Sequence, residues 1–303
     1  MIELPRILCA VDFSEFSRRA LDHALSVARS HRSTVTVLHV IAPAPAAVAS
    51  NYYFGAETPP PVLLSMMDRE TATRELERLV RTEAIPGLKV ETLVAESFEV
   101  HREILAQAAR LHPSLLVLGT HGRSGFERLF LGSTAEKVLR KASCPVMTVP
   151  PKAPDAMVSS QVPFRQIVCG VDFSNSSRAA LDYAMSLSRE DRAALAVVHV
   201  IDTHPMYVDF APPAAIDLHA WTRQASAGLH ELVAEKVRPT CNVTEVVREG
   251  RPYEEILGLA RELDADVIVL GVHGRGTADL FFFGSTTHHV VREAHCAVLT
   301  LRG

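Results

Sequence analysis

The sequence predicts an α/β protein built from two copies of one doubly wound, parallel-sheet domain. Apolar runs rich in β-branched residues alternate with longer amphipathic stretches, a pattern that favours strand–helix units with right-handed crossovers. A first series of such units is followed by a proline-rich segment and by a second series that copies its motifs. Each series also contains a glycine-bearing loop between a strand and a helix. In sheets of this class, ligands bind beyond the carboxyl ends of the strands.

The first copy begins with an apolar strand at residues 7–11 and a helix at residues 15–31, for which Ser14 is a suitable N-cap. The remaining elements are expected as a strand at 34–41, a helix at about 66–82, a strand at 90–95, a helix at 100–111, a strand at 115–118, a helix after Gly132 and a last strand at 145–149. Residues 42–63 are rich in Pro and Ala and too long for a simple connection. This segment is therefore either a functional cover or an insertion.

The second copy restarts after residue 163. Val-Asp-Phe-Ser recurs at 11–14 and 171–174, and Val-x-His-Val-Ile recurs at 37–41 and 197–201. We therefore expect two related domains at residues 1–150 and 164–303, joined by a linker at 151–163. The first and fourth strands of each copy end in acidic or glycine-bearing turns, so these two strands should be neighbours with a crevice between them.

Both copies carry the pattern Gly-x-His-Gly, nine residues, Gly-Ser-Thr. Such a loop at a helix N-terminus can hold phosphate, because the first N–H groups of the helix are unpaired and its dipole favours negative charge. Glycines let the backbone approach an anion closely and take a positive φ. Two alternatives stay open: Ser133 could cap the helix in a capping box with Glu136, and Asp12 and Asp172 could form Asx turns rather than contact a ribose or a metal–phosphate group.

Composition excludes several classes of function. The chain has 303 residues, of which 48% are hydrophobic and 22% charged, and its net charge of −4 provides no basic footprint for nucleic acid. It has no apolar run near the ~20 residues that cross a bilayer and no secretory leader, so we expect cytoplasmic residence and no membrane contact. The cysteines lack metal or redox spacing and are interpreted as core residues: Cys9, Cys144, Cys169, Cys241 and Cys296.

The histidines favour structural roles over metal binding. His39 and His199 lie in the second strands and should be satisfied near the core. His121 and His273 lie in the glycine loops, where bonding to a neighbouring carbonyl would shape the loop. The later residues His288, His289 and His295 invite a zinc interpretation, but adjacent helical residues do not share a face. We therefore expect no metal site from the protein alone.

Taken together, the repeated motifs resemble those of tandem, ATP-binding members of the universal stress protein family. The resemblance implies strand order 3-2-1-4-5, a pseudo-twofold between the domains with contact through their fifth strands, and binding of ATP or a related adenine nucleotide. The nucleotide-binding residues that it implies in the first domain are Ala10, Asp12, Val40, Leu118, Gly119, Gly122, Gly132, Ser133 and Thr134. Those that it implies in the second domain are Gly170, Asp172, Val200, Leu270, Gly271, Gly274, Gly284, Ser285 and Thr286. Arg123 and Arg275 follow the second glycines and could reach a phosphate or lie in solvent.

The loops favour binding over hydrolysis, because they lack the lysine and the metal-holding hydroxyl of a Walker A loop. We expect no catalytic residues. The expected function is that of a regulatory stress protein in which bound ATP orders the loops and residues 42–63 and so alters a surface for an unnamed protein partner. Mg near Asp12 and Asp172 is one option for an ion bound with the ATP. The paired domains could also form a homodimer. Alternatives are a slow ATPase or self-phosphorylating enzyme, and a nucleotide-independent scaffold or small-metabolite binder that uses residues 52–54.

Overall fold

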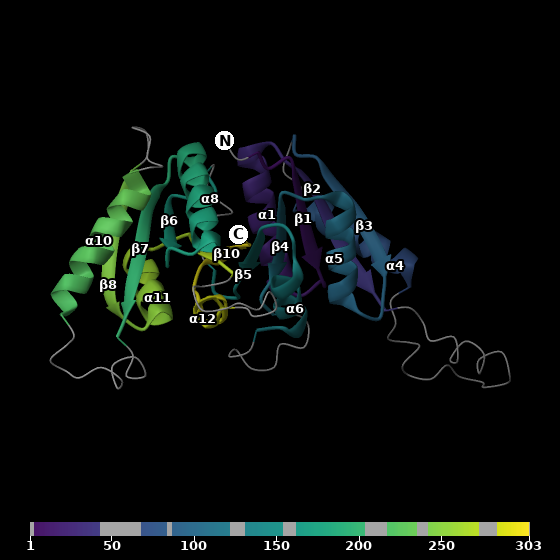
Figure 1. Cartoon of the computed structure of the whole chain (residues 1–303). Coiled ribbons are helices and arrows are strands. Elements are labelled where there is room, and N and C mark those ends of the chain that lie inside the picture. Colours follow the sequence, from purple (N-terminus) through teal and green to yellow (C-terminus); the bar gives the residue numbers. More distant parts are fainter. Residues whose placement is uncertain are drawn as a thin grey trace, which may run out of the picture.

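The computed structural model describes residues 3–42, 68–83, 87–121, 131–153, 162–203, 217–234, 242–272 and 284–302. Within these residues the chain forms one ten-stranded sheet with helices on both faces (Figure 1). The strands lie in the order β3-β2-β1-β4-β5-β10-β9-β6-β7-β8. Each half therefore has the order 3-2-1-4-5, and the predicted α/β fold class is confirmed.

The elements of the first half are β1 (Arg6–Val11), α1 (Glu15–His31), β2 (Thr34–Ile41), α4 (Arg69–Thr82), β3 (Val90–Glu96), α5 (Val100–Leu111), β4 (Leu115–Gly119), α6 (Ser133–Lys141) and β5 (Val146–Val149). Those of the second half are β6 (Gln166–Gly170), α8 (Asn175–Asp191), β7 (Ala194–Asp202), α10 (Leu218–Ala234), β8 (Val243–Gly250), α11 (Pro252–Glu262), β9 (Val267–Gly271), α12 (Ser285–Glu293) and β10 (Ala297–Leu301). The bounds agree closely with the sequence prediction. Helix α4 differs at its start, because the Asp68 side chain accepts from the Thr71 N–H at 2.6 Å and caps the helix there.

The first helix of each half begins directly after the strand that precedes it. Ser14 is the N-cap of α1, as predicted, and its hydroxyl accepts from the Ser17 N–H at 3.1 Å. Ser174 caps α8 in the same way. Both helices end at an arginine in the left-handed conformation, Arg32 and Arg192. The duplicated sequence thus produces the same helix start and the same helix end in both halves.

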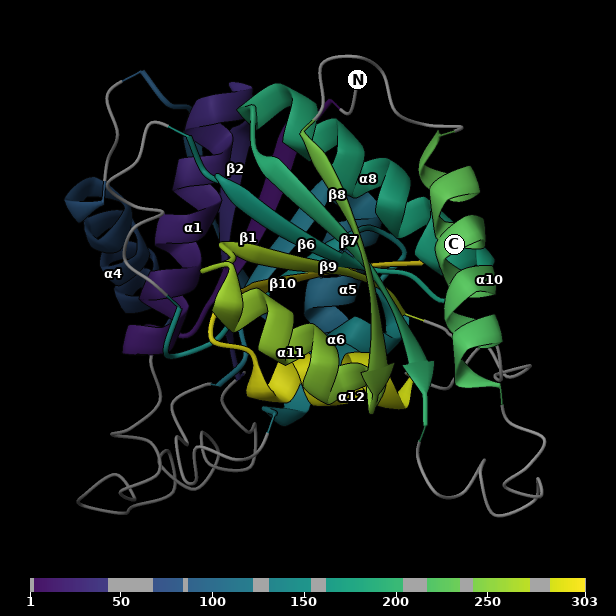
Figure 2. The same ribbon diagram turned by 90° about the vertical axis from the view of Figure 1, so that its left-hand side faces the viewer.

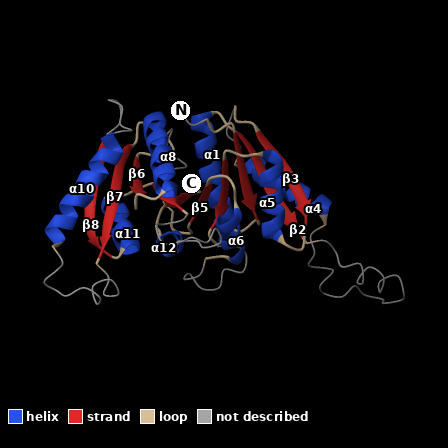
Figure 3. Cartoon of the chain, viewed as in Figure 1, coloured by secondary structure: helices blue, strands red, loops and turns tan. Residues whose placement is uncertain are grey.

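Two layers of helices cover the sheet. Helices α1, α4, α8 and α10 pack on one face, and α5, α6, α11 and α12 pack on the other (Figures 2 and 3). Cys9 and Cys169 are fully buried under the first layer and Cys296 under the second, as predicted for core residues, and burial raises the pKa of the Cys296 thiol to about 12. Cys144 is half-buried, whereas Cys241 lies outside the described residues. Among the described helices, none is both long and apolar enough to span a membrane.

The two halves join through their fifth strands. β5 and β10 pair antiparallel, with Met147 opposite Leu299 at the centre. On either side of this pair, the Thr148 hydroxyl donates to the Val298 carbonyl at 3.3 Å and the Thr300 hydroxyl donates to the Val146 carbonyl at 3.2 Å. Because these two bonds exchange equivalent positions of the halves, a pseudo-twofold axis passes between β5 and β10. The expected contact through the fifth strands is confirmed.

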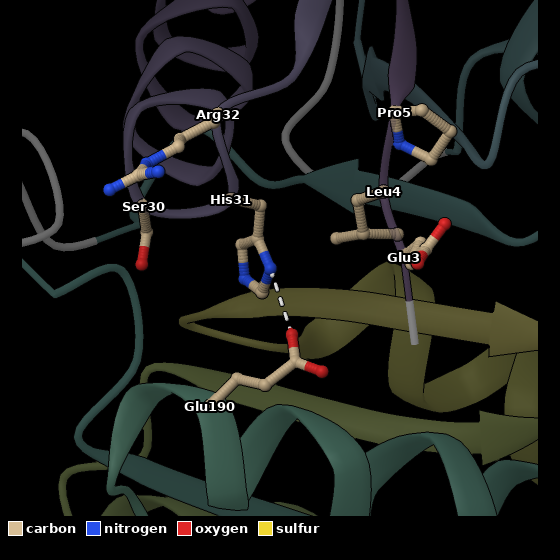
Figure 4. A pocket seen from close by; sticks show the side chains of 7 residues that line it. All are labelled: Glu3, Leu4, Pro5, Ser30, His31, Arg32 and Glu190. Carbon is tan, nitrogen blue, oxygen red and sulfur yellow. Dashed lines mark ion pairs between the residues drawn. The ribbon is translucent and has the colours of Figure 1, made fainter. Parts of the chain in front are cut away.

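A second contact across this axis joins the last turns of α1 and α8. His31 Nδ1 lies 3.0 Å from Glu190 Oε2, and His31 Nε2 lies 3.6 Å from Asp191 Oδ1. The Ser30 hydroxyl donates to Asp191 Oδ1 at 3.0 Å. The pair Ser30–His31 occupies the same place in the first half as Glu190–Asp191 in the second. His31 and Glu190 border a cavity of about 430 Å³, which Figure 4 shows beside the first strand.

This contact favours the charged form of His31. Burial alone would lower its pKa, but the hydrogen bonds and charges of Asp191 and Glu190 outweigh burial and raise the pKa of the ring above its usual value. The Asp191 side chain is 0% exposed, so a protonated imidazole is a close counter-charge for a fully buried carboxylate.

Replacing His31 by Gln should destabilise the protein more at about pH 6 than at about pH 9. The folded-state pKa of His31 lies above the unfolded value of about 6.5, so protonation stabilises the fold fully below that value and the contribution is lost as the pH rises through the folded-state pKa. We expect urea unfolding to show a loss of about 2 kcal/mol at the lower pH and a smaller loss at the higher pH. His112→Asn, at an exposed left-handed helix end, is the matched control. An equal loss at both pH values would contradict the assignment.

Candidate functional site

A cavity of about 470 Å³ opens at the carboxyl ends of the strands of the first half. It lies where β1 and β4, which pair in parallel as predicted, end beside the start of α6. Its walls come from β1, β2, β4, α5 and α6. The lining residues are Ala10, Val11, Asp12, Ser17, Leu38, His39, Val40, Ile41, Ala42, Val100, Ile104, Leu118, Gly119, Thr120, His121, Gly132, Ser133, Thr134 and Ala135.

This cavity gathers the described candidate residues of the first half. Ala10 and Asp12 come from the end of β1, Val40 from β2, Leu118 and Gly119 from β4, and Gly132, Ser133 and Thr134 from the start of α6. Gly122 and Arg123 lie outside the described residues, as do residues 42–63 apart from Ala42. Segments far apart in the chain meet here because parallel strands end at one edge of the sheet.

Gly132 is required for a close approach between backbone segments. Its N–H donates to the Thr120 carbonyl at 2.8 Å, and a β-carbon on this residue would lie 3.0 Å from the same oxygen. Its φ is −58°, and that of the matching Gly284 is −55°. Neither glycine therefore uses its freedom to take a positive φ, and the steric limit at Gly132 comes from the Thr120 carbonyl and not from the backbone dihedral.

The first turn of α6 presents to the cavity backbone donors that have no partner within the helix. Gly132 is the N-cap and makes no side-chain cap bond, and the first bond within the helix runs from the Glu136 N–H to the Gly132 carbonyl at 2.9 Å. The N–H groups of Ser133, Thr134 and Ala135 precede that bond, so they have no partner within the helix. Together with the helix dipole, they suit an anion.

The capping-box interpretation of Ser133 is wrong. Ser133 is the first helical residue and not the N-cap, and its side chain is exposed. The carboxylate of Glu136, which would complete the box, instead accepts from Arg140 at 2.7 Å. Because glycine precedes Ser133, the Ser133 hydroxyl is not needed to start the helix.

Asp12 forms the Asx turn that the sequence left as one of two alternatives, and its contact with a ribose or a metal–phosphate group stays a prediction. Its Oδ1 accepts from the Ser14 N–H at 3.0 Å and from the Ser14 hydroxyl at 2.6 Å, which is an Asx turn. Asp172 and Ser174 repeat these bonds in the second half. Asp12 also lines the cavity. The turn thus fixes a carboxylate at the edge of the cavity.

The histidine of the second strand in each half contacts the backbone at the end of the first strand. His39 is 6% exposed, and its Nδ1 lies 2.7 Å from the Val11 carbonyl oxygen. The ring of Phe13, a residue with a φ of 64°, packs 4.2 Å from the His39 ring. His199 makes the equivalent contact with the Val171 carbonyl at 2.8 Å. The prediction that His39 and His199 are satisfied near the core is confirmed.

His121 does not bond a carbonyl as predicted. Its Nδ1 lies 2.9 Å from the Thr120 hydroxyl oxygen, and its ring packs 5.9 Å from that of Phe16. Burial lowers the pKa of His121, which favours a neutral ring near pH 7. His273 lies outside the described residues.

Part of the cavity wall was missed by sequence reasoning. Val100 and Ile104 of α5 line it, as does Thr120 after β4. The spacing of four between Val100 and Ile104 places them on one helix face, and this was the available signal. The spacing does not show which group of a ligand this helix face would contact. That contact depends on how α5 lies across the sheet.

The second half repeats the backbone of the site. The Gly284 N–H donates to the Val272 carbonyl at 3.0 Å, and Gly284 is the N-cap of α12. A β-carbon on Gly271 would lie 2.7 Å from the carbonyl carbon of Ser176, so this glycine permits the end of β9 to pack against α8. The corresponding residues that the structure describes are Gly170, Asp172, Val200, Leu270, Gly271, Gly284, Ser285 and Thr286. Gly274 and Arg275 lie outside the described residues.

The later histidines make contacts with aromatic and acidic neighbours. His289 stacks on Tyr253 with ring centroids 4.4 Å apart and an interplanar angle of 20°. Its Nδ1 also lies 3.3 Å from the Glu293 carboxylate. Burial is the main cause that lowers the pKa of His288 and His295. Within the described residues, no group of three or more His, Cys, Asp or Glu side chains is arranged to hold a metal ion.

Comparison with known proteins places both halves in one family. The profile of the universal stress protein family matches residues 3–150 and 163–302. A universal stress protein of Mycolicibacterium smegmatis is 28% identical over 313 residues, which cover 98% of this chain and 96% of that protein. Universal stress protein A homolog 1 of Coxiella burnetii is 34% identical over 143 residues, which cover 47% of this chain and 94% of that protein. The crystal structure of a universal stress protein from Archaeoglobus fulgidus covers 99% of this chain and 99% of its own, with a TM-score of 0.67 and 22% identity.

The substitution Gly132→Ala should destabilise the protein by about 1 kcal/mol, because the added methyl group would crowd the Thr120 carbonyl at 3.0 Å. Gly258→Ala is the control: this glycine lies inside α11 with its nearest neighbour at 3.6 Å, so alanine should stabilise by about 0.5–1 kcal/mol. Urea unfolding of both variants measures the difference. Equal stability of Gly132→Ala and the parent protein would show that the close approach is not constrained.

Proposed function

Since this chain belongs to the universal stress protein family, we propose that it is a regulatory protein that binds ATP or a related adenine nucleotide in the cavity of its first half. One observation carries the proposal: a single cavity joins an apolar wall, a fixed carboxylate and a helix N-terminus. These are the three kinds of group that a base, a ribose and a phosphate chain require. The volume of about 470 Å³ falls within the ordinary range for small-ligand sites.

The base would lie between the strand ends and α5. Leu118 and Ile104, both buried, provide apolar contact there, and the main chain at Ala10 and Val40 borders the same space. Apolar walls favour a flat heteroaromatic ring, and main-chain groups at its edge would select its hydrogen-bonding pattern.

The ribose and the phosphates would lie toward Asp12 and α6. The Asp12 carboxylate, held by its turn, would accept from ribose hydroxyls, and it could also face a magnesium ion that accompanies the phosphates. The N–H groups of Ser133 and Thr134 would donate to phosphate oxygens. Arg123 and Arg275 stay predictions, because they lie outside the described residues.

Binding without efficient hydrolysis is the chemistry that these groups support. Backbone donors stabilise bound phosphate, but phosphoryl transfer also needs aligned metal ions and an activated nucleophile. The described lining residues include two histidines: His39, whose Nδ1 lies 2.7 Å from the Val11 carbonyl oxygen, and His121, whose ring packs against Phe16 and Thr120. We therefore propose that occupancy by the nucleotide, rather than its turnover, is the regulatory signal.

ATP with magnesium should stabilise the protein, by about 2.7 kcal/mol at a free ligand concentration of about 100 Kd. Gly132→Val should weaken ATP binding by at least about tenfold, because its side chain would displace the start of α6 from Thr120. Thermal unfolding and isothermal titration calorimetry measure both effects, with Gly258→Ala as a variant expected to bind like the parent. Parent-like binding by Gly132→Val would refute the site assignment, and no response of the parent to ATP would refute nucleotide binding.

The substitution Asp12→Asn should weaken ATP binding about tenfold, because the amide keeps the acceptor that forms the turn but removes the negative charge offered to the ribose. The penalty should disappear for 2′,3′-dideoxy-ATP, which lacks the ribose hydroxyls. Calorimetric titration of parent and variant with both ligands forms a double-mutant cycle. An equal penalty for both ligands would show that Asp12 does not act through the ribose, and repeating the titration without magnesium separates an effect on the metal ion from an effect on the fold.

A further inference from the structure

Of four matched positions around the site, two differ between the halves and two carry the same residue type. All four lie where the side chains of the strands and of the covering helices meet. The first-half residues are Ala10, Ile104, Leu118 and Ala135, and their counterparts are Gly170, Ile256, Leu270 and Thr287.

The first difference is the packing over Gly170. A β-carbon on Gly170 would lie 2.7 Å from Leu270 Cδ2 and 3.0 Å from Ile256 Cδ1. The two apolar side chains therefore occupy the volume that the methyl group of Ala10 fills in the first half. Gly170 is buried, whereas Ala10 is part-exposed and lines the cavity. In the second half, the surface on which a base would lie is covered by side chains.

The second difference is a hydrogen bond at the start of α12. Thr287 is 5% exposed, and its hydroxyl donates to the Gly271 carbonyl at 2.9 Å. Ala135, its counterpart, has no hydroxyl and lines the open cavity. Thr287 thus joins the first turn of α12 to the end of β9 by a hydrogen bond that Ala135, which borders the cavity of the first half, cannot make.

The third difference lies between the two helices that flank the site. Tyr253 of α11 and His289 of α12 stack at 4.4 Å. The corresponding residues of α5 and α6 are His101 and Lys137, and a lysine has no ring to stack. The helices over the second site are therefore held together by a contact that the first half lacks.

We infer that the second half is a closed counterpart of the first, so that one chain binds one adenine nucleotide, in its first half. This inference rests on the function proposed above. Opening the second site would require Leu270 and Ile256 to leave apolar packing over Gly170 and Thr287 to break its bond to Gly271. The first site is already open, so its nucleotide displaces solvent and not side chains.

The first test is the stoichiometry of ATP with magnesium on the full chain, measured by isothermal titration calorimetry and by equilibrium dialysis. The expected value is about one nucleotide per chain, lost in Gly132→Val and kept in Gly284→Val. A value of about two, or loss in Gly284→Val alone, would overturn the inference while leaving nucleotide binding intact. No binding at all would instead refute the proposed function and, with it, this inference.

The second test exchanges the distinguishing residues between the halves. The variant with Ala10→Gly and Ala135→Thr gives the first site the residues of the second, and its ATP affinity should fall at least about tenfold. The variant with Gly170→Ala and Thr287→Ala gives the second site the residues of the first, and its stoichiometry should rise toward two. Circular dichroism confirms that each variant is folded.

A crystal structure of the parent with ATP provides a readout that does not depend on the stability of any variant. Nucleotide in the first half, with Leu270 still against Gly170 in the second, would support the inference. Nucleotide in both halves, or parent-like affinity in the folded variant with Ala10→Gly and Ala135→Thr, would overturn it.

Discussion

The hydrogen bond from the Gly132 N–H to the Thr120 carbonyl is the contact on which the candidate site depends. At 2.8 Å it joins the start of α6 to the segment after β4, and it leaves too little room for a β-carbon. Because the N-cap is glycine, no side chain competes for the amide groups of the first helical turn. These groups stay available beside the Asp12 carboxylate. The candidate site is thus made mainly by backbone geometry, and donors arranged in this way suit an anion.

The two halves have similar backbones, but because they belong to one chain, their side chains can differ at matched positions. If either half paired with a copy of itself, like residues would meet at the axis, with two aspartates or two histidines facing each other. In the fused chain His31 meets Asp191, so a buried carboxylate lies beside an imidazole whose charged form this contact favours. The matched candidate sites differ in the same way, since Ala135 borders the cavity of the first half whereas Thr287 forms a hydrogen bond to the Gly271 carbonyl.

Local sequence signals predicted local structure well. Strand and helix bounds followed from apolar periodicity, and the cap at Ser14 followed from residue type, because both depend on neighbours in the chain. The capping box at Ser133 was a local signal that failed. Its four-residue pattern was present, but the bond between Gly132 and Thr120 moved the start of the helix by one residue. The Asx turn at Asp12 and contact with a ribose or metal–phosphate group were alternatives in the sequence, but the turn does not remove the carboxylate from the cavity, because Asp12 lines it.

By itself, the sequence determined the fold class, the duplication and the edge of the sheet where a ligand would lie, because alternating strands and helices allow few arrangements and parallel strands end together. Tertiary structure alone decided which side chains meet there. The closure of Leu270 and Ile256 over Gly170, the pairing of His31 with Asp191 and the wall supplied by α5 each join residues far apart in the chain. Such contacts depend on differences in packing as small as one methyl group. No local sequence pattern specifies the distance between two elements.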